Sequence, residues 1–315
     1  MFPSNTILGG FLVSLLCVGV IGNSLLFMLY VYSFLVRSRF RRPIDPIFIH
    51  LVIVNMLTVI FAMISYIMSS FGVRHFLDDA GCKAVLYVFR VTRGLSICTT
   101  SILSTFQAIT IIPSNSKWAW LKPKLSMWTC CSFLFSWLIN LLIYVHVIET
   151  VVAKINHTDV GDGYYHVFCK IRLPYFRTKE LFLGVIITGD VLFMIIMMLT
   201  SFYMVTLLYK HHKGAQHLRS RSLSCKTSPE HRATLSILLL VSCFVIFYWL
   251  NNFITLYGFY THERLPILGV IVVIVSSFYP TFCPFLLMSN NKIISQFISS
   301  LSILRITCFQ RAFGG

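Results

Sequence analysis

The segment Cys82–Ile112, CKAVLYVFRVTRGLSICTTSILSTFQAITII, decides the fold because it determines whether the chain has six membrane spans or seven. Its length is sufficient, since a helix needs roughly 20 mostly apolar residues to cross the hydrocarbon layer. It also carries Arg90 and Arg93, which make it the least hydrophobic of the candidate spans. The remaining sequence must therefore show whether a span is required here.

The composition indicates that most of the chain lies in lipid. Hydrophobic residues make up 57% of it and charged residues 11%, whereas charges make up about a quarter of a soluble domain. The mean hydropathy is +0.80. Seven windows are long and apolar enough to span a membrane: Ile7–Val36, Ile44–Gly72, Cys82–Ile112, Leu125–Ile148, Leu181–Tyr209, Ala233–Tyr260 and Leu265–Ser289.

The charges between the spans indicate the orientation. With the amino terminus outside, the cytoplasmic parts are Arg37–Arg42, Lys117–Lys124, Lys210–Arg232 and the tail after Met288. They hold 16 Lys and Arg against two acids, and the other side holds eight against seven. Positively charged loops remain in the cytoplasm. Leaving out the third span would put both tails on one side and spoil this asymmetry. The sequence therefore predicts an all-α bundle of seven transmembrane helices with an extracellular amino terminus.

The net charge of +16 is mostly a consequence of this topology. It is poor support for nucleic-acid binding, and no nucleic-acid partner is expected. A basic inner face instead attracts anionic membrane lipid and suits an acidic cytoplasmic partner.

The chain is expected to form a bundle over residues 1–289 and a cytoplasmic tail over 290–315. The first apolar run is too long for a cleaved signal peptide and is expected to stay as an anchor. Ligands from outside are therefore expected to bind in or on the bundle. In the tail, apolar residues at helical spacing predict an amphipathic helix on the inner membrane surface: Ile293, Ile294, Phe297, Ile298, Leu301 and Leu304.

Two of the ten cysteines are expected in an oxidising compartment. Cys82 is at the outer mouth of the third span, and Cys169 is in the long outer loop before the fifth. We predict a Cys82–Cys169 disulfide, the alternative being two unrelated thiols. The same loop carries Asn156-His157-Thr158, a glycosylation sequon that functions only on the luminal side.

Three charges lie within spans and are candidates for ligand contact. Charged residues inside a membrane face the bundle interior and are often functional. Arg90 and Arg93 lie one helical turn apart. They could bind an anionic group such as sulfate or carboxylate, or be neutralised by Asp190 and Glu149. Both interpretations stay open.

No enzyme is expected. Thr188-Gly189-Asp190 resembles part of an intramembrane aspartyl protease motif, but the second intramembrane aspartate that this chemistry needs is missing. His211, His212 and His217 lie in a basic loop without Cys or acidic companions, so no metal site is predicted. No cofactor motif was found.

Several motifs resemble those of the rhodopsin-like receptors. These are Gly22-Asn23, Trp137 and the Cys82/Cys169 pair. The standard signatures are altered. Asn55 stands in place of a sodium-binding Asp, and Gln107-Ala108-Ile109 replaces the acidic-Arg-aromatic triplet. In the last two spans no proline follows Trp249, and Cys283-Pro284 replaces Asn-Pro.

The altered signatures resemble those of the type 1 vomeronasal receptors. The matching stretches are His50–Asn55, Arg93–Thr100, Phe106–Pro113 and Arg232–Ser242, and the likeness runs from the first span to Pro284. It implies a plasma-membrane pheromone receptor that senses small odorants and acts through an inhibitory-type heterotrimeric G protein. The expected ligand contacts are Arg90, Arg93, Asp190, Ile97, Trp249 and Asn252.

The inner ends of the third and sixth spans are expected to couple to the G protein. The residues are Gln107, Ala108, Ile109, Thr110 and Arg232. Gln107 cannot form the salt bridge that an arginine would form, so hydrogen bonding or packing must restrain the resting state. We therefore predict basal activity. Pro280 and Pro284 permit either a hinge or a static bend in the last span.

Two other functions remain as alternatives. A bitter-taste receptor is similar in size and charge, but its usual Leu-x-x-Ser-Leu run is not found at Met204–Leu208. A channel or transporter would need a file of polar residues along several spans, and those present are few. An opsin is not expected, because Leu265–Ser289 contains no lysine for a Schiff base.

Overall fold

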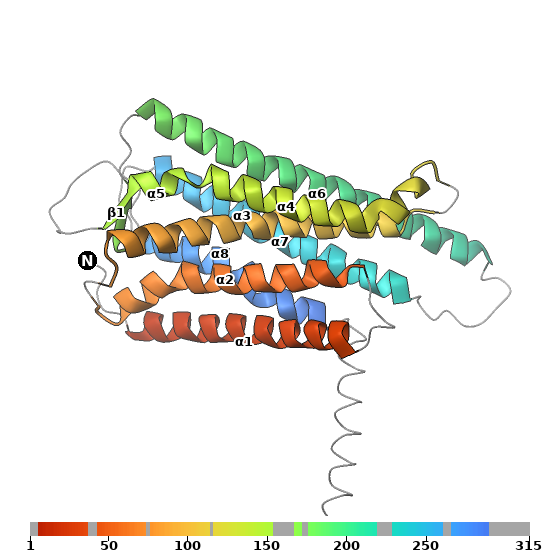
Figure 1. The fold of residues 1–315 in the computed structure, drawn as a ribbon. Helices are drawn as coiled ribbons and strands as arrows, with labels where there is room; N and C mark the ends of the chain where they lie inside the picture. Colours follow the sequence, from red (N-terminus) through yellow and green to blue (C-terminus); the bar gives the residue numbers. More distant parts are fainter. Residues whose placement is uncertain are drawn as a thin grey trace, which may run out of the picture.

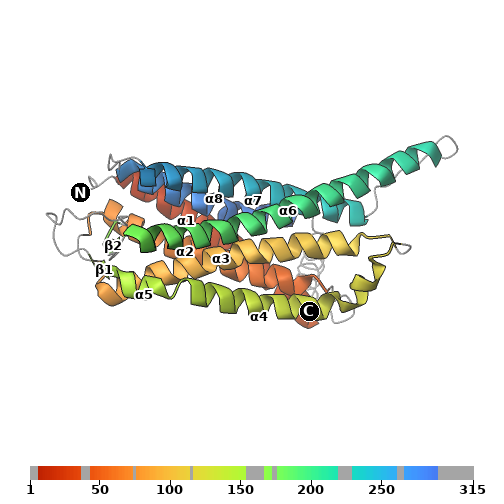
Figure 2. The same ribbon diagram turned by 90° about the horizontal axis from the view of Figure 1, so that it is seen from above.

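The expected seven-helix bundle is confirmed. The computed structural model describes residues 6–36, 43–73, 76–113, 116–153, 167–171, 176–218, 229–260 and 266–289. Within these ranges seven long helices lie side by side (Figures 1 and 2). In chain order the elements are α1 (Thr6–Val36), α2 (Asp45–Ser70), α3 (Asp79–Thr110), the 3-10 helix η2 (Ala119–Lys124), α4 (Leu125–Ile143), α5 (His146–Thr150), β1 (Val151–Ala153), β2 (Cys169–Ile171), α6 (Phe176–Leu218), α7 (Pro229–Tyr260) and α8 (Pro266–Ser289).

The polar helix α3 lies at the centre of the bundle. In the described part of the chain, six helical segments are long and apolar enough to span a membrane, and α3 is not one of them. It packs against α2, α4, α6 and α7, and most of its residues from Cys82 to Ala108 are buried. Because neighbouring helices shield it from lipid, α3 can carry Arg90 and Arg93 without a long apolar surface.

The helix α4 shows the opposite arrangement. Its buried residues are the polar Thr129, Ser136 and Asn140, while Leu134, Phe135 and other large apolar side chains are exposed. This pattern is expected for a helix with one face in lipid, where polar groups must find partners inside the bundle. Beyond the predicted span Leu181–Tyr209, α6 extends at both ends and reaches Leu218.

A small hairpin covers the end of the bundle where α1 begins. Gly9 of α1 packs against Phe71 at the end of α2. At this end β1 pairs antiparallel with β2, with Ala153 opposite Cys169. The predicted Cys82–Cys169 disulfide is present and attaches the hairpin to the first turns of α3. Asn156 and the predicted helix in residues 290–315 lie outside the described residues.

The two prolines of α8 change its hydrogen bonding. Pro284 has no N–H, so it cannot donate to the carbonyl of Pro280. Asn23 of α1 supplies the missing donor, since its Nδ2 lies 2.9 Å from this carbonyl oxygen. Close contact with α1 therefore stabilises α8 at its prolines. Whether α8 acts as a hinge stays a prediction.

Gly94 allows the close approach of α3 to α4. A Cβ at this position would collide with the side chain of Asn140. Asn140 is itself held in place, because its Nδ2 donates to the Ser136 carbonyl at 2.8 Å and contacts the Cys98 sulfur at 3.6 Å.

We expect Gly94→Ala to destabilise the protein by about 1–3 kcal/mol, because a well-packed interface must move apart. The measurement is the melting temperature of the purified protein in detergent. Gly184→Ala is the matched control: Gly184 lies in α6, and a methyl group at this position would have no heavy atom within 4 Å. Asn140→Ala should relieve the collision and partly restore Gly94→Ala. Equal melting temperatures for the two glycine variants would refute the packing argument.

Candidate functional site

A set of polar side chains surrounds Arg93 at the interface of α3, α6 and α7, and we call it the Arg93 cluster. Its members are Arg93, Asp190, Tyr248, Asn251 and Asn252. The Nη2 of Arg93 donates to Asn252 Oδ1 at 3.2 Å. When the Asn251 amide donates to the Val272 carbonyl at 3.1 Å, its oxygen accepts from both terminal Arg93 nitrogens at 2.7 and 3.1 Å. Two neutral amides thus bind the guanidinium.

Tyr248 lies between the positive and negative charges of the cluster. The Arg93 guanidinium carbon is 5.1 Å from the centroid of the Tyr248 ring, an arrangement in which the ring's negative face attracts the cation. The Tyr248 hydroxyl donates to Asp190 Oδ2. No carboxylate in the described part of the chain forms an ion pair with Arg93. Of the two interpretations left open for the arginines, neutralisation by Asp190 or Glu149 thus has no direct ion pair to Arg93 among the described residues, and Tyr248 lies between Arg93 and Asp190.

A cavity of about 30 Å³ adjoins the cluster. A water molecule needs roughly 10–15 Å³ by this measure, so the space suits about two waters. Pockets for small organic ligands are typically about 300–1,000 Å³. Side chains or helices must therefore move before such a ligand can fit. The lining residues are Thr58, Arg93, Ser96, Ile97, Phe244, Phe247, Tyr248, Asn251, Val275, Ser276, Tyr279 and Pro280.

The structure places the expected ligand contacts differently. Arg93 and Ile97 line the cavity, and Asp190 and Asn252 hold Tyr248 and Arg93 in place. Arg90 lies one turn from Arg93 and is partly buried, with no hydrogen bond or ion pair to any described residue. Trp249 does not line the cavity and is 51% exposed on the outer surface of the bundle.

Sequence reasoning missed Tyr248 and Asn251. Both are neighbours of residues that it selected, Trp249 and Asn252. Asn252 does bind Arg93. Because a helix turns about 100° per residue, Trp249 instead faces outward while the adjacent Tyr248 faces the interior. Asn251 is only 2% exposed. The available signal was the run of two aromatic residues, Tyr248 and Trp249, followed closely by Asn251 and Asn252. The sequence did not show which member of each pair faces inward.

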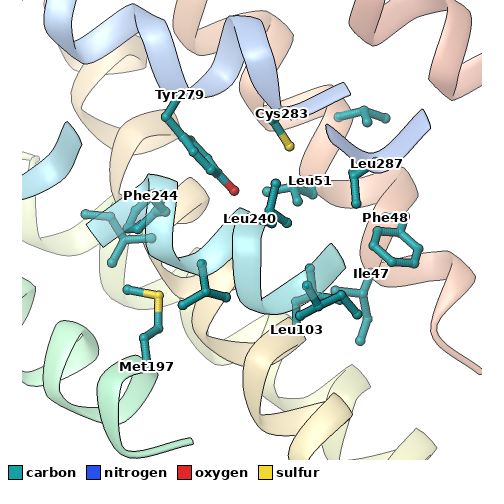
Figure 3. Close-up of a cluster of buried hydrophobic side chains, with 14 of the residues drawn as sticks. Ile47, Phe48, Leu51, Leu103, Met197, Leu240, Phe244, Tyr279, Cys283 and Leu287 are labelled. Atoms are coloured by element: carbon teal, nitrogen blue, oxygen red, sulfur yellow. The ribbon is translucent and has the colours of Figure 1, made fainter. Parts of the chain in front are cut away.

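Aromatic side chains connect the Arg93 cluster to the interior of the bundle. Tyr248 stacks on Phe244 with centroids 5.5 Å apart, and Phe244 meets the edge of Tyr279 at 4.5 Å. The Tyr279 hydroxyl lies 3.1 Å from Thr100 Oγ1 on α3. Figure 3 shows Phe244, Leu240 and Tyr279 converging from α7 and α8. Packed side chains thus connect the Arg93 cluster continuously to the inner half of the bundle.

At two positions where the charged motifs of rhodopsin-like receptors are replaced, this chain has an amide side chain that forms a hydrogen bond. Asn55 is fully buried and accepts from Ser96 Oγ at 2.8 Å. At the inner end, Gln107 Nε2 donates to Thr234 Oγ1 at 3.1 Å and connects α3 to α7.

The other expected coupling residues lie around this bond. Ala108 packs with Met204 and Leu238. Ile109 is partly buried, and Thr110, at the end of α3, donates to the Phe106 carbonyl at 2.8 Å. Arg232 belongs to α7, but its side chain lies outside the described residues.

The fold is that of a rhodopsin-like receptor. The structure of squid rhodopsin superposes with a TM-score of 0.72, covering 96% of this chain and 81% of the other at 16% sequence identity. At that identity the likeness concerns the fold alone, which is a seven-helix membrane bundle.

The chain belongs to the vomeronasal organ pheromone receptor family, whose sequence model matches residues 6–300. Vomeronasal type-1 receptor 90 of Rattus norvegicus is 37% identical over 90% of this chain and 91% of its own. Vomeronasal type-1 receptor 4 of Homo sapiens is 34% identical over 91% and 95%. The protein is thus a chemosensory G-protein-coupled receptor and a multi-pass protein of the plasma membrane. The family is one of receptors, not of enzymes.

We expect Tyr248→Phe to lower the melting temperature, because Asp190 loses a hydrogen bond in a site with little water. Loss of one partner of a buried pair typically costs about 1–3 kcal/mol. Tyr203→Phe removes the same hydroxyl from an exposed position of α6 and should have little effect.

Asp190→Asn supplies the second half of a double-mutant cycle. Because Tyr248 and Asp190 form one interaction, the double variant should be clearly more stable than the sum of the single effects predicts. Additive effects would mean that the two side chains are energetically independent.

Proposed function

We propose that a small pheromone or odorant with an acidic or strongly accepting group binds beside Arg93. The observation that carries this proposal is a guanidinium that lines a cavity and has neutral amides as its hydrogen-bond partners. An amide oxygen offers the guanidinium only a dipole, whereas a carboxylate or sulfate adds the attraction between full charges and can bind through two parallel hydrogen bonds. An anionic group can therefore compete with an amide for Arg93.

The cavity walls support a ligand with an apolar body. Ile97, Phe244 and Phe247 contribute apolar surface around the one charged lining residue. Sites for small molecules commonly combine such walls with a few polar groups that set orientation. Arg90, one turn away, adds a second positive charge. Asp190 is assigned a positioning role, because it binds Tyr248 and does not line the cavity.

The ligand site is tested with Arg93→Gln and Arg90→Gln in cells that express the receptor. Candidate ligands are screened in pairs that share an apolar skeleton and differ only in a sulfate or carboxylate against an alcohol. We expect Arg93→Gln to weaken the response to the acidic member by about tenfold or more, since a charged hydrogen bond contributes about 1.5–3 kcal/mol. The response to the alcohol should change much less.

Two controls accompany this screen. Surface labelling shows that the variants reach the plasma membrane, and Arg93→Lys keeps the charge without the forked geometry. Normal responses of Arg93→Gln and Arg90→Gln to every acidic ligand would rule out the polar site.

We further propose that the receptor activates an inhibitory-type G protein and that the Gln107–Thr234 hydrogen bond restrains it at rest. The family resemblance supports the choice of G protein. The neutral bond between α3 and α7 supports the restraint. Such a bond contributes about 0.5–1.5 kcal/mol, less than one involving charged groups. Thermal motion therefore breaks it often, and basal activity follows.

We expect Thr234→Val to raise basal nucleotide exchange by about two- to tenfold, because valine keeps the shape of threonine but cannot accept the Gln107 hydrogen bond. Purified receptor is mixed with inhibitory, stimulatory and Gq-type heterotrimers in parallel, and the same assay identifies the coupled class. Thr206→Val is the control, since Thr206 donates only to the Phe202 carbonyl of its own helix. An unchanged or lower basal rate for Thr234→Val would contradict the restraint.

A further inference from the structure

A basic and aromatic segment lies at the cytoplasmic end of the bundle, and we call it the η2 patch. It comprises η2 with its neighbours: Lys117, Trp118, Trp120, Lys122, Lys124 and Trp128. Figure 1 shows this segment in yellow, at the end of the bundle opposite β1. Residues 116–128 contain three lysines and no acid. Neither the ligand site nor the Gln107–Thr234 contact uses any of them.

The indole rings of the patch are exposed. Trp118 is 60% exposed, Trp120 52% and Trp128 53%. Tryptophan is enriched where membrane meets water, because its ring is largely apolar and its N–H needs a polar partner. Three such rings within 11 residues of chain indicate that this segment lies at the boundary between membrane and water.

The patch is continuous with a surface that faces lipid. Met127 and Trp128 in the first turn of α4 are exposed, and the buried residues of α4 are all on its polar side. Since η2 runs directly into α4, its rings lie where the hydrocarbon layer ends and the headgroups begin. A soluble partner would have to compete with lipid for this position.

The lysines lie at the level of the rings. Lys124 Nζ is 5.3 Å from the centroid of the Trp120 ring, so a cation–π contact holds the ammonium beside an interfacial indole. Lys117 is exposed and Lys122 partly exposed. At this depth the ammonium groups meet phosphates and carboxylates of lipid headgroups, and the described part of the segment has no acid to neutralise them.

We propose that the η2 patch binds anionic phospholipid headgroups of the cytoplasmic leaflet and thereby fixes the second inner loop and the start of α4 on the membrane. The tryptophans set the depth and the lysines select the negative charge. Each lysine near a negative surface strengthens binding about fivefold.

The test uses purified full-length receptor in nanodiscs of phosphatidylcholine that contain a minority of nitroxide-labelled lipid. The label sits near the acyl carbonyls, and the headgroup is either phosphatidylserine or phosphatidylcholine. Quenching of tryptophan fluorescence reports lipid contact. We expect labelled phosphatidylserine to produce the same degree of quenching as labelled phosphatidylcholine at a several-fold lower mole fraction of labelled lipid.

The variant Lys117→Gln/Lys122→Gln/Lys124→Gln keeps every tryptophan and should lose this selectivity. Lys210→Gln/Lys213→Gln/Arg219→Gln removes the same charge from the last turns of α6 and the residue after it, and this variant should keep the selectivity. Melting temperatures show whether each variant is folded.

Three outcomes overturn the proposal. The first is equal quenching by the two lipids in the unaltered receptor. The second is an equal loss of selectivity in both triple variants, which would indicate a general effect of charge. In the third, the η2 variant keeps its lipid selectivity but activates G protein more weakly, which would make the patch a protein contact instead.

Discussion

The structure depends on one constraint, which is that polar groups in a lipid-embedded chain must find their partners within the protein. Helices satisfy the backbone groups, and the bundle arranges the side chains accordingly. Thus α3, the most polar helix, lies in the middle, and α4 buries only polar residues. Where Pro284 removes a backbone donor, Asn23 of another helix replaces it. The interior of this protein therefore contains clusters of polar side chains among its buried apolar residues.

Within that interior, neutral groups do much of the work that ion pairs do elsewhere. Arg93 is bound by two amides and an aromatic ring. Asn55 accepts from Ser96, and Gln107 donates to Thr234. The contacts between neutral groups can be exchanged at a lower energetic cost than a buried salt bridge, whose disruption leaves an unpaired charge. Such an interior suits a receptor whose helices must shift when a ligand arrives.

The cavity beside Arg93 connects this property to function. It is too small for an organic ligand as the helices stand, yet it adjoins the aromatic contacts between Tyr248, Phe244 and Tyr279. Enlarging the cavity must therefore move side chains of these residues or shift α7 relative to α3 or α8. The same two helices, α3 and α7, carry the Gln107–Thr234 contact. The proposed ligand site and the proposed inner-end restraint thus involve one pair of helices.

The sequence by itself determined the seven long helices and the Cys82–Cys169 disulfide, because hydropathy and redox compartment act over whole segments and tolerate small errors of position. The sidedness of the loops, which the loop charges indicate, stays a prediction. It also selected Arg93, since a charge within a span is conspicuous. Only the tertiary structure decided that Tyr248 and Asn251 face inward while Trp249 faces out. Side-chain direction changes by about 100° with each residue, so it depends on how the helices pack against one another and not on the apolar character of a whole span.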